Sequence, residues 1–296
     1  MQENNLSSSK ILTADIGGSH ITVGICDLET RTILKQSIVR MDVFSKGSAN
    51  DILSSWERAF LEVLKKNSGL PILGLSVAMP GPFDYENGIS QIKGLNKYEA
   101  LYDMDIRQCF ANFLNLEPDL IRFRNDAEST IAGEVLMGAG EGSQRVLGVT
   151  LGTGFGSAYS ENNFTQNINL GADTFKGSIA DDYLSTLWFS KRYMELTGVS
   201  LSGGVRELSE LAPKSTVART IFKEFAVNMG DVLSAPVKQF SPQVLIICGN
   251  IAKASEYFLP HLIQRFDSIS IKLALLDENA PLIGAAALFD NNPVQA

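Results

Sequence analysis

The sequence predicts an α/β protein in which one strand–turn–strand motif occurs twice. Segments typical of buried strands and segments with helical spacing are mixed in both halves of the 296-residue chain, which is the pattern of the α/β class. Ile11-Leu-Thr-Ala-Asp-Ile-Gly-Gly-Ser-His and Val146-Leu-Gly-Val-Thr-Leu-Gly-Thr-Gly-Phe also share one layout, 135 positions apart. Each indicates a strand, a glycine turn and a second strand. Because hairpins are common, the repeat alone leaves duplication and coincidence equally open.

The individual elements follow from local patterns along the chain. Apolar runs bounded by turn residues predict strands, and apolar residues at helical spacing predict helices. The spacing of Ile52, Trp56, Phe60 and Val63, for example, predicts a helix that begins near Asn50 and places Trp56 in the core. Strands are expected at residues 11–16, 20–27, 72–79, 120–124, 146–151, 243–248 and 269–275. Further helices are expected at residues 127–137, 179–196, 215–235, 251–266 and 281–289.

The composition is that of a folded protein with a large core. Hydrophobic residues make up 45% of the chain and charged residues 20%, and the length is sufficient for two lobes. The formal net charge of −8 argues against nucleic-acid binding, which needs a positive surface. The polar start MQENNLSSSK does not resemble a signal peptide, and no apolar run reaches transmembrane length. The three separated cysteines form no C-x-x-C pair. These features predict a cytoplasmic protein that binds no membrane.

Two glycine-rich turns are the first candidates for a functional site. Gly17-Gly18-Ser19 follows the first strand, and Gly152-Thr153-Gly154-Phe155-Gly156 follows its counterpart. Neither turn is a Walker A loop, and neither opens a helix as a Rossmann fingerprint does, because β-like sequence follows each one. Glycine lacks a Cβ, so these turns can bring backbone N–H groups close to phosphate oxygens. The hydroxyls of the serine and the threonine add further donors.

Asp15 lies beside the first turn and is a candidate metal ligand. A carboxylate at this position can hold Mg²⁺, directly or through water, and the metal would neutralise charge on the β- and γ-phosphates of a nucleotide. A plain hairpin turn is the competing interpretation of Gly17-Gly18, and it would be preferred for an isolated pair of glycines. The adjacent carboxylate and the second turn in register favour phosphate binding.

Four motifs in order give the chain its resemblance to a known family. They are Asp15-Ile-Gly-Gly-Ser, Met79-Pro-Gly-Pro-Phe-Asp84, Asn125-Asp126 and Leu151-Gly-Thr-Gly-Phe-Gly156. With these, residues 10–290 resemble the ROK family, which contains glucokinase-like sugar kinases and some transcriptional repressors. The resemblance implies an actin-like ATPase fold, a duplicated ribonuclease H-like motif with ATP and sugar in a cleft between two lobes. The lobes are expected at residues 10–124 with 282–296, and at residues 125–281.

The resemblance also assigns roles to the motif residues. Residues 15–19 and 152–156 resemble the two phosphate segments, and Gly249-Asn250 resembles the adenosine segment, which is usually Gly-Gly. Asp126 falls on the catalytic base and Asn125 on a sugar-hydroxyl ligand. Gly81, within Pro80-Gly81-Pro82, falls on the sugar-side wall of the cleft, although a rigid exit from the preceding strand explains that tripeptide equally well. From its local sequence, Asp126 is also a typical helix N-cap, and both roles can coexist.

The chain departs from the family pattern in two places. The cysteine-rich zinc motif is missing, so no structural zinc is expected. The Glu-x-Gly-His segment that commonly holds the sugar is replaced by Gly171-Ala-Asp-Thr-Phe-Lys176, in which Asp173 can stand for the glutamate and Lys176 for the histidine. Glu134, two turns into the expected helix 127–137, is interpreted as a solvated or salt-bridged residue.

These observations predict an ATP-dependent sugar kinase. It would transfer the γ-phosphate of ATP to a hydroxyl of a hexose or N-acetylhexosamine, with ATP and Mg²⁺ as its cofactors and Asp126 as the general base. The alternative is a non-catalytic sugar- or nucleotide-binding regulator that has kept the fold. A DNA-binding role is not expected, because only about ten residues precede the first strand. A homodimer is left open.

Overall fold

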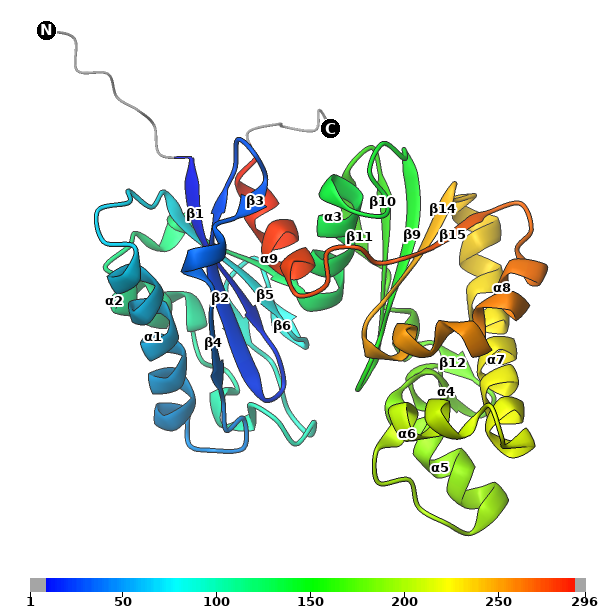
Figure 1. Cartoon of the computed structure of the whole chain (residues 1–296). Coiled ribbons are helices and arrows are strands. Elements are labelled where there is room, and N and C mark those ends of the chain that lie inside the picture. Colours follow the sequence, from blue (N-terminus) through cyan, green and yellow to red (C-terminus); the bar gives the residue numbers. More distant parts are fainter. Residues whose placement is uncertain (1–8, 291–296) are drawn as a thin grey trace, which may run out of the picture. The chain divides into compact units, whose positions relative to one another are not determined.

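The computed structural model describes residues 9–290 (Figure 1). Contacts between Cα atoms divide the chain into two compact units, one that runs up to Gly133 and resumes at Glu278, and one formed by Glu134–Asp277. These boundaries differ from the expected lobe limits at residues 124 and 282, and Asp126 therefore belongs to the first unit. Residues 291–296 of the expected first lobe lie outside the described residues.

The first unit is built on a six-stranded sheet. Its main path has the order β3-β2-β1-β5-β8, and β4 also pairs with β2. The β1–β2 pair is antiparallel, whereas β5 is parallel to both β1 and β8. The strands are β1 (Lys10–Ile16), β2 (His20–Asp27), β3 (Thr32–Ile33), β4 (Val39–Asp42), β5 (Gly74–Met79) and β8 (Ile121–Asn125). A separate small hairpin consists of β6 (Phe83–Asp84) and β7 (Ile89–Ser90).

Helices cover both faces of this sheet. Figure 1 shows α1 (Ala49–Lys66) and α2 (Ile106–Leu114) on one face and α9 (Asn279–Ala286) on the other. Ser48 and Asp51 form a capping box that starts α1, because each side chain bonds the backbone N–H of the other residue. The short 3₁₀ helices of this unit are η1 (Lys35–Ser37), η2 (Glu99–Leu101), η3 (Pro118–Leu120) and η6 (Ala287–Phe289).

Aromatic side chains fill the core between α1, α2 and the sheet. Trp56 and Phe60 of α1 are fully buried, as the spacing predicted, and both rings contact Phe110 of α2 at centroid distances of 5.7 and 5.2 Å. Aromatic pairs of this kind stabilise a core by about 0.5–1.5 kcal/mol beyond the area they bury.

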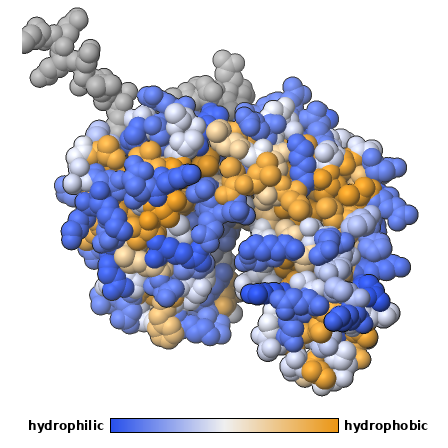
Figure 2. Space-filling model, in the orientation of Figure 1, coloured by the Kyte–Doolittle hydropathy of each residue, from blue (hydrophilic) through white to orange (hydrophobic). Residues whose placement is uncertain are grey.

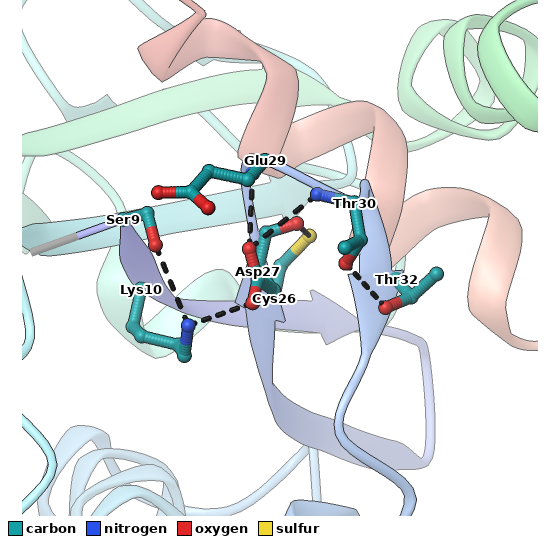
Figure 3. Close-up of polar contacts among 7 residues, drawn as sticks. All are labelled: Ser9, Lys10, Cys26, Asp27, Glu29, Thr30 and Thr32. Atoms are coloured by element: carbon teal, nitrogen blue, oxygen red, sulfur yellow. Dashed lines mark hydrogen bonds and ion pairs between the residues drawn. The ribbon is translucent and has the colours of Figure 1, made fainter.

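The end of the β1–β2 hairpin that lies away from its turn is fixed by an ion pair. Lys10 and Asp27 are register partners, and the Lys10 ammonium lies 2.7 Å from the Asp27 carboxylate (Figure 3). The same carboxylate accepts the backbone N–H of Glu29 at 2.9 Å, which closes the following turn. The open end of the hairpin is therefore anchored.

The second unit repeats the strand order of the first. Its sheet has the order β11-β10-β9-β14-β15, in which β9–β10 is antiparallel and β14 is parallel to β9 and β15. The strands are β9 (Arg145–Leu151), β10 (Phe155–Glu161), β11 (Phe164–Asn167), β14 (Val244–Cys248) and β15 (Ser270–Leu273). Because both sheets place a glycine hairpin and then parallel strands in the same order, the repeat noticed in the sequence is confirmed as a duplicated motif.

Helices of the second unit pack around a large apolar core. Trp188 and Phe189 contact Phe225 at centroid distances of 6.0 and 4.7 Å, so Trp188 is a core residue. The helices are α4 (Asp181–Leu184), α5 (Thr186–Thr197), α6 (Gly204–Leu211), α7 (Thr216–Phe240) and α8 (Leu259–Arg265), with 3₁₀ helices η4 (Leu170–Ala172) and η5 (Asn250–Tyr257). A small hairpin, β12 (Thr174–Phe175) and β13 (Ser178–Ile179), precedes α4.

Two expected helices are interrupted. The helix predicted over residues 179–196 is wrong at its start, because Lys176 and Gly177 have positive φ values of 48° and 84° and turn the chain into the β12–β13 hairpin. Ser185 is extended and separates α4 from α5. The helix predicted over 251–266 is a 3₁₀ segment followed by α8, whose first turn contains a proline.

Glu134 corrects a third expectation. It lies on α3 (Asp126–Met137) and is fully buried rather than solvated. Its carboxylate accepts the backbone N–H groups of Ala139, Leu275 and Leu276 at 2.8, 3.0 and 2.8 Å. Buried carboxylates are tolerated when several donors surround them, so this glutamate ties α3 to the segment after β15.

The surface carries scattered hydrophobic residues among hydrophilic ones. In Figure 2, hydrophobic side chains reach the surface at the end of the second unit that holds α5. Among the residues of that helix, Leu187 is 73% exposed. Within residues 9–290, no helix is both long and apolar enough to cross a membrane.

Candidate active site

The predicted site residues of the first unit gather at one edge of its sheet. Strands β1, β5 and β8 are parallel, so their carboxyl ends lie together. Asp15 is in register with Ala78, and Met79 is in register with Asn125. The first glycine turn, the chain after Met79 and the start of α3 therefore leave the sheet at the same edge, which is where ligands bind in sheets of this type.

The first glycine turn presents backbone donors to its surroundings. Residues 17–19 connect β1 and β2, and Gly17 donates its N–H to the carbonyl of His20 at 2.9 Å. Gly18 and Ser19 are exposed, and no acceptor in the described part of the chain takes either N–H. A Cβ at Gly18 would meet nothing within 4 Å, so the space in front of the turn is open. Adjacent free amides in a turn form an anion-binding concavity.

Asp15 and Asp126 are two half-buried carboxylates with raised pKa values. The pKa of Asp15 is raised from 3.8 to about 7, mainly by burial and then by the negative charge of Asp126, with a smaller effect of Glu278 and with Arg40 opposing the rise. Burial also raises the pKa of Asp126, which is opposed by the backbone N–H of Ala127 and by the positive charge of Lys97. Both groups therefore gain a proton more readily than an ordinary aspartate.

The helix cap is supplied by Asn125 rather than by Asp126. The Asn125 side-chain oxygen accepts the N–H of Glu128 at 3.1 Å, which is the cap bond at the start of α3. Asp126 is the first residue of α3, and one oxygen of its carboxylate accepts the N–H of the following Ala127 at 2.8 Å. The Asn125 side chain and the backbone N–H of Asp126 also act on this carboxylate and lower its pKa, against the stronger effect of burial.

Tyr85 fixes the orientation of the Asn125 amide. Its hydroxyl donates to the carbonyl of Met79 at 3.0 Å and accepts from the Asn125 amide nitrogen at 3.1 Å. The same hydroxyl lies 3.3 Å from where a Cβ on Gly81 would be, so Gly81 lies against it. Gly81, Tyr85 and Asn125 thus form one contiguous wall beside Asp126.

The second glycine turn also presents free backbone amides, although it is closed by a different hydrogen bond. It spans residues 152–154 between β9 and β10, and Gly156 is already a strand residue paired with Thr150. Gly152 donates to the carbonyl of Gly154 at 3.0 Å, and the N–H groups of Thr153 and Gly154 meet no acceptor within residues 9–290. Each unit therefore presents a three-residue turn with two free amides.

Asp181, which the sequence did not single out, supports the second turn. Its carboxylate accepts the N–H of Phe155 at 2.5 Å and lies against Gly154. The carbonyl of Gly152 accepts the N–H of Thr186, at the start of α5, at 2.8 Å. The position of the turn is thus set by α4 and α5, which follow it in sequence.

Gly249 and Asn250 lie beside this turn. Gly249 has a φ of 90°, and a Cβ there would lie 2.3 Å from the carbonyl oxygen of Leu151, the residue before Gly152. Only glycine fits such an approach. Asn250 begins η5, and its side-chain oxygen accepts the Lys253 ammonium at 2.9 Å. The structure therefore brings the predicted adenosine and phosphate segments of the second unit together.

The segment that stands in place of the family's sugar segment leads into the β12–β13 hairpin. Asp173 is exposed and precedes the β12–β13 hairpin. The Lys176 ammonium donates to the side-chain oxygen of Asn228 on α7 at 2.6 Å. Lys176 also lines a hollow of about 710 Å³, whose other lining residues include Trp188, Lys191 and Lys223. None of the other predicted site residues lines this hollow.

Within residues 9–290, no three His, Cys, Asp or Glu side chains come together in the manner of a metal site. The Asp15 carboxylate nevertheless suits a site at which it and a bound phosphate would together hold Mg²⁺. Its half-buried carboxylate is next to a second negative charge, and a divalent cation would offset both burial and repulsion.

The duplicated sheets, each with a glycine turn after its first strand, define a protein of the actin-like ATPase fold. A model of the ROK family matches residues 11–177, more than half of the chain, and the chain belongs to the ROK family. In sequence it is similar to a glucokinase of Thermotoga maritima, with 21% identity over 94% of this chain and 96% of that protein. It is also similar to an N-acetyl-D-glucosamine kinase of Haemophilus influenzae, with 23% identity over 93% and 97%.

Solved structures agree with this fold. A ROK family glucokinase of Streptomyces griseus in complex with glucose and AMPPNP matches with a TM-score of 0.76 and 21% identity, covering 94% of this chain and 98% of that one. A ROK family transcriptional regulator, a homologue of the E. coli MLC protein, matches with a TM-score of 0.80 and 14% identity, covering 97% of this chain and 78% of that one. At such low sequence identities, these structural matches show the fold alone.

Proposed function

We propose that this protein is an ATP-dependent sugar kinase that transfers the γ-phosphate of ATP to a hydroxyl of a hexose or N-acetylhexosamine. The observation that carries the proposal is the position of Asp126, a half-buried carboxylate with a raised pKa at the sheet edge that also holds the first glycine turn. Relatives that match over nearly their full length include a glucokinase and an N-acetyl-D-glucosamine kinase, which supports this substrate class.

Asp126 is the proposed general base. A sugar hydroxyl is a weak nucleophile, and a carboxylate within hydrogen-bond reach can accept its proton as phosphoryl transfer proceeds. A raised pKa brings this carboxylate closer to the operating pH, where proton transfer is most effective. The amide of Asn125, oriented by Tyr85, is proposed to bind a neighbouring sugar hydroxyl, with Gly81 forming the wall beside it.

Both glycine turns are proposed to bind the triphosphate. The free amides of Gly18, Ser19, Thr153 and Gly154 can each donate to a phosphate oxygen. Asp15 is proposed to hold Mg²⁺, directly or through water, and the ion when bound would neutralise phosphate charge. Residues 249–250 are proposed to contact the adenosine.

The exposed Asp173 carboxylate is the remaining proposed sugar ligand. A carboxylate can accept hydrogen bonds from two sugar hydroxyls, as the glutamate of the family segment is expected to do. Lys176 is not included, because its ammonium is engaged by Asn228. The contribution of this segment to sugar choice is therefore expected to rest on one acidic side chain.

A non-catalytic regulator is the second candidate. Two observations favour it, namely the high TM-score to a ROK transcriptional regulator and the engagement of Lys176 away from a sugar-binding role. A regulator of this kind would bind sugar or nucleotide without consuming ATP.

The test is an ADP-release assay over hexoses, amino sugars and N-acetyl sugars, run beside calorimetric titration with AMPPNP. The proposed function predicts sugar-dependent ADP release by the wild-type protein and its loss in Asp126→Asn, while AMPPNP binding is retained. Nucleotide or sugar binding without ADP release from any sugar would favour the regulator. Equal turnover by wild type and Asp126→Asn would exclude Asp126 as the base.

A further inference from the structure

The carbonyl groups of the first glycine turn are held by side chains from distant parts of the chain. The Tyr98 hydroxyl donates to the carbonyl oxygen of Gly17 at 2.5 Å, across 81 positions of sequence. The Ser45 hydroxyl donates to the carbonyl oxygen of Gly18, also at 2.5 Å and across 27 positions. Both donors lie in segments that the sequence analysis did not connect with the turn.

The third carbonyl of the turn is engaged as well. The carbonyl of Ser19 accepts the backbone N–H of Val43 at 2.8 Å. All three carbonyls of residues 17–19 therefore face donors, and the exposed amides of Gly18 and Ser19 are left as the free polar groups of the turn backbone. An anion-binding turn requires this separation, because a carbonyl aimed at the ligand would repel phosphate oxygens.

Tyr98 and Ser45 form one rigid assembly, which we call the hydroxyl clamp. Tyr98 is fully buried, its ring lies 5.3 Å from that of Trp56, and its backbone N–H donates to the carbonyl of Ser45 at 2.6 Å. Ser45 is 8% exposed. Tyr98 also has a left-handed backbone conformation with a φ of 54°, which is uncommon for a bulky residue and persists only where surrounding contacts enforce it.

We infer that Tyr98 and Ser45 are positioning residues for the triphosphate of the nucleotide. The clamp orients the peptide groups of the turn before the ligand arrives, so that binding requires no reorganisation of the turn. This inference rests on the proposed function, because it assigns the clamp to the nucleotide of that reaction.

The clamp also bears on the base. Lys97 directly precedes Tyr98, and its positive charge acts on Asp126. Anchoring Tyr98 thereby anchors the segment that carries Lys97. The hydroxyl clamp thus contacts the first glycine turn, and it also fixes the segment whose Lys97 charge acts on Asp126, the proposed base.

The experiment compares three variants. Tyr98→Phe and Ser45→Ala each delete only a side-chain hydroxyl, whereas Ser45→Thr keeps a hydroxyl at position 45. Tyr102→Phe, at a tyrosine that is 49% exposed in the same segment, is the matched control. AMPPNP affinity is measured by calorimetry, and KM for ATP, KM for the sugar and kcat by ADP release. Thermal unfolding establishes that each variant is folded.

We expect Tyr98→Phe to weaken AMPPNP binding and raise KM for ATP by about tenfold, the usual effect of leaving a buried acceptor unpaired. Ser45→Ala should weaken binding by a smaller factor, and Ser45→Thr should recover most of it. KM for the sugar should stay within about twofold, and Tyr102→Phe should match the wild type. A lower unfolding temperature with unchanged AMPPNP affinity in both deletions would overturn the inference, since the clamp would then be only structural. Wild-type protein that binds no nucleotide would instead refute the proposed function, and the clamp assignment with it.

Discussion

Replacing Asp15 by asparagine should make the first unit more stable while removing its proposed metal ligand. The Asp15 carboxylate is costly because it is half-buried and repelled by Asp126 and Glu278, so that its pKa lies at about 7 instead of 3.8. Well below pH 3.8, the Asp15 carboxyl group is protonated in the folded and in the unfolded state, and it does not lower the free energy of unfolding. As the pH rises toward 7, the unfolded chain releases the proton and the folded chain does not, so the folded state loses stability.

The size of this effect follows from the shift. One pKa unit corresponds to about 1.4 kcal/mol, so a shift from 3.8 to about 7 corresponds to about 4 kcal/mol at most. Asparagine does not titrate. The stability difference between Asp15→Asn and the wild type should therefore grow by up to about 1.4 kcal/mol per pH unit between pH 5 and pH 7, and it should level off above pH 7.

The two tryptophans allow the measurement to be made on one unit. Trp56 lies in the first unit and Trp188 in the second, so in a Trp188→Phe background fluorescence reports the unit that contains Asp15. Urea unfolding is followed at pH 5, 6, 7 and 8, with Asp119→Asn, an exposed carboxylate of the same unit, as the control for lost charge. A stability difference that does not change with pH would refute the reasoning about burial. A further expectation is that Mg²⁺ and ATP raise the unfolding midpoint of the wild type but not of Asp15→Asn.

Three other substitutions test separate parts of the structure. Asp126→Asn should lower kcat by roughly 10²–10⁴-fold with little change in KM for ATP, as measured by ADP release; near wild-type turnover would contradict its role as base. Glu134→Ala leaves the N–H groups of Ala139, Leu275 and Leu276 unpaired and should destabilise the protein by roughly 3 kcal/mol in urea, whereas the exposed Glu141→Ala should have little effect. Gly284→Ala would place a Cβ 1.8 Å from the carbonyl of Ser129 and should lower stability by roughly 2 kcal/mol, and an unchanged unfolding curve would show that α9 can move away from α3.

The elements that the sequence predicted well are those specified by local pattern. The strands before both glycine turns show little alternation between polar and apolar residues, and they are almost fully buried, as central strands are. The turns contain the residues that tight turns require. The repeat was visible because both hairpins keep the same spacing between strand and turn. Helix α1 was predictable because its apolar residues keep one face.

The failures lie where tertiary contacts override local pattern. Residues 179–196 have helical composition, but Ser185 breaks the helix there, where the carbonyl of Gly152 engages the N–H of Thr186. Glu134 was interpreted as solvated because glutamate on a helix usually is, and the donors that justify its burial come from Leu275 and Leu276, far along the chain. Such partners leave no trace in the local sequence.

The candidate site also contains some residues that local sequence predicts and others that only tertiary contacts reveal. Asp15, the glycine turns and Asn125-Asp126 could be named from their motifs, although their roles stay predictions. Tyr85, Ser45 and Tyr98 could not. The hydroxyls of Ser45 and Tyr98 meet distant backbone carbonyls, and the hydroxyl of Tyr85 meets the distant side-chain amide of Asn125. The left-handed conformation of Tyr98 has no sequence signal, since tyrosine is not a residue that favours it.

The energetics of the two aspartates bear on the choice between kinase and regulator. A fold that keeps Asp15 and Asp126 half-buried with raised pKa values is less stable without ligand than one with neutral residues at these positions. A protein that only bound sugar would recover little of this free energy, because a neutral ligand offsets neither charge. A magnesium-bound triphosphate beside Asp15 and a hydroxyl that donates its proton to Asp126 would offset both. The two carboxylates therefore support a ligand that includes a magnesium-bound triphosphate over one that consists of sugar alone, and the pH dependence of Asp15→Asn measures the free energy involved.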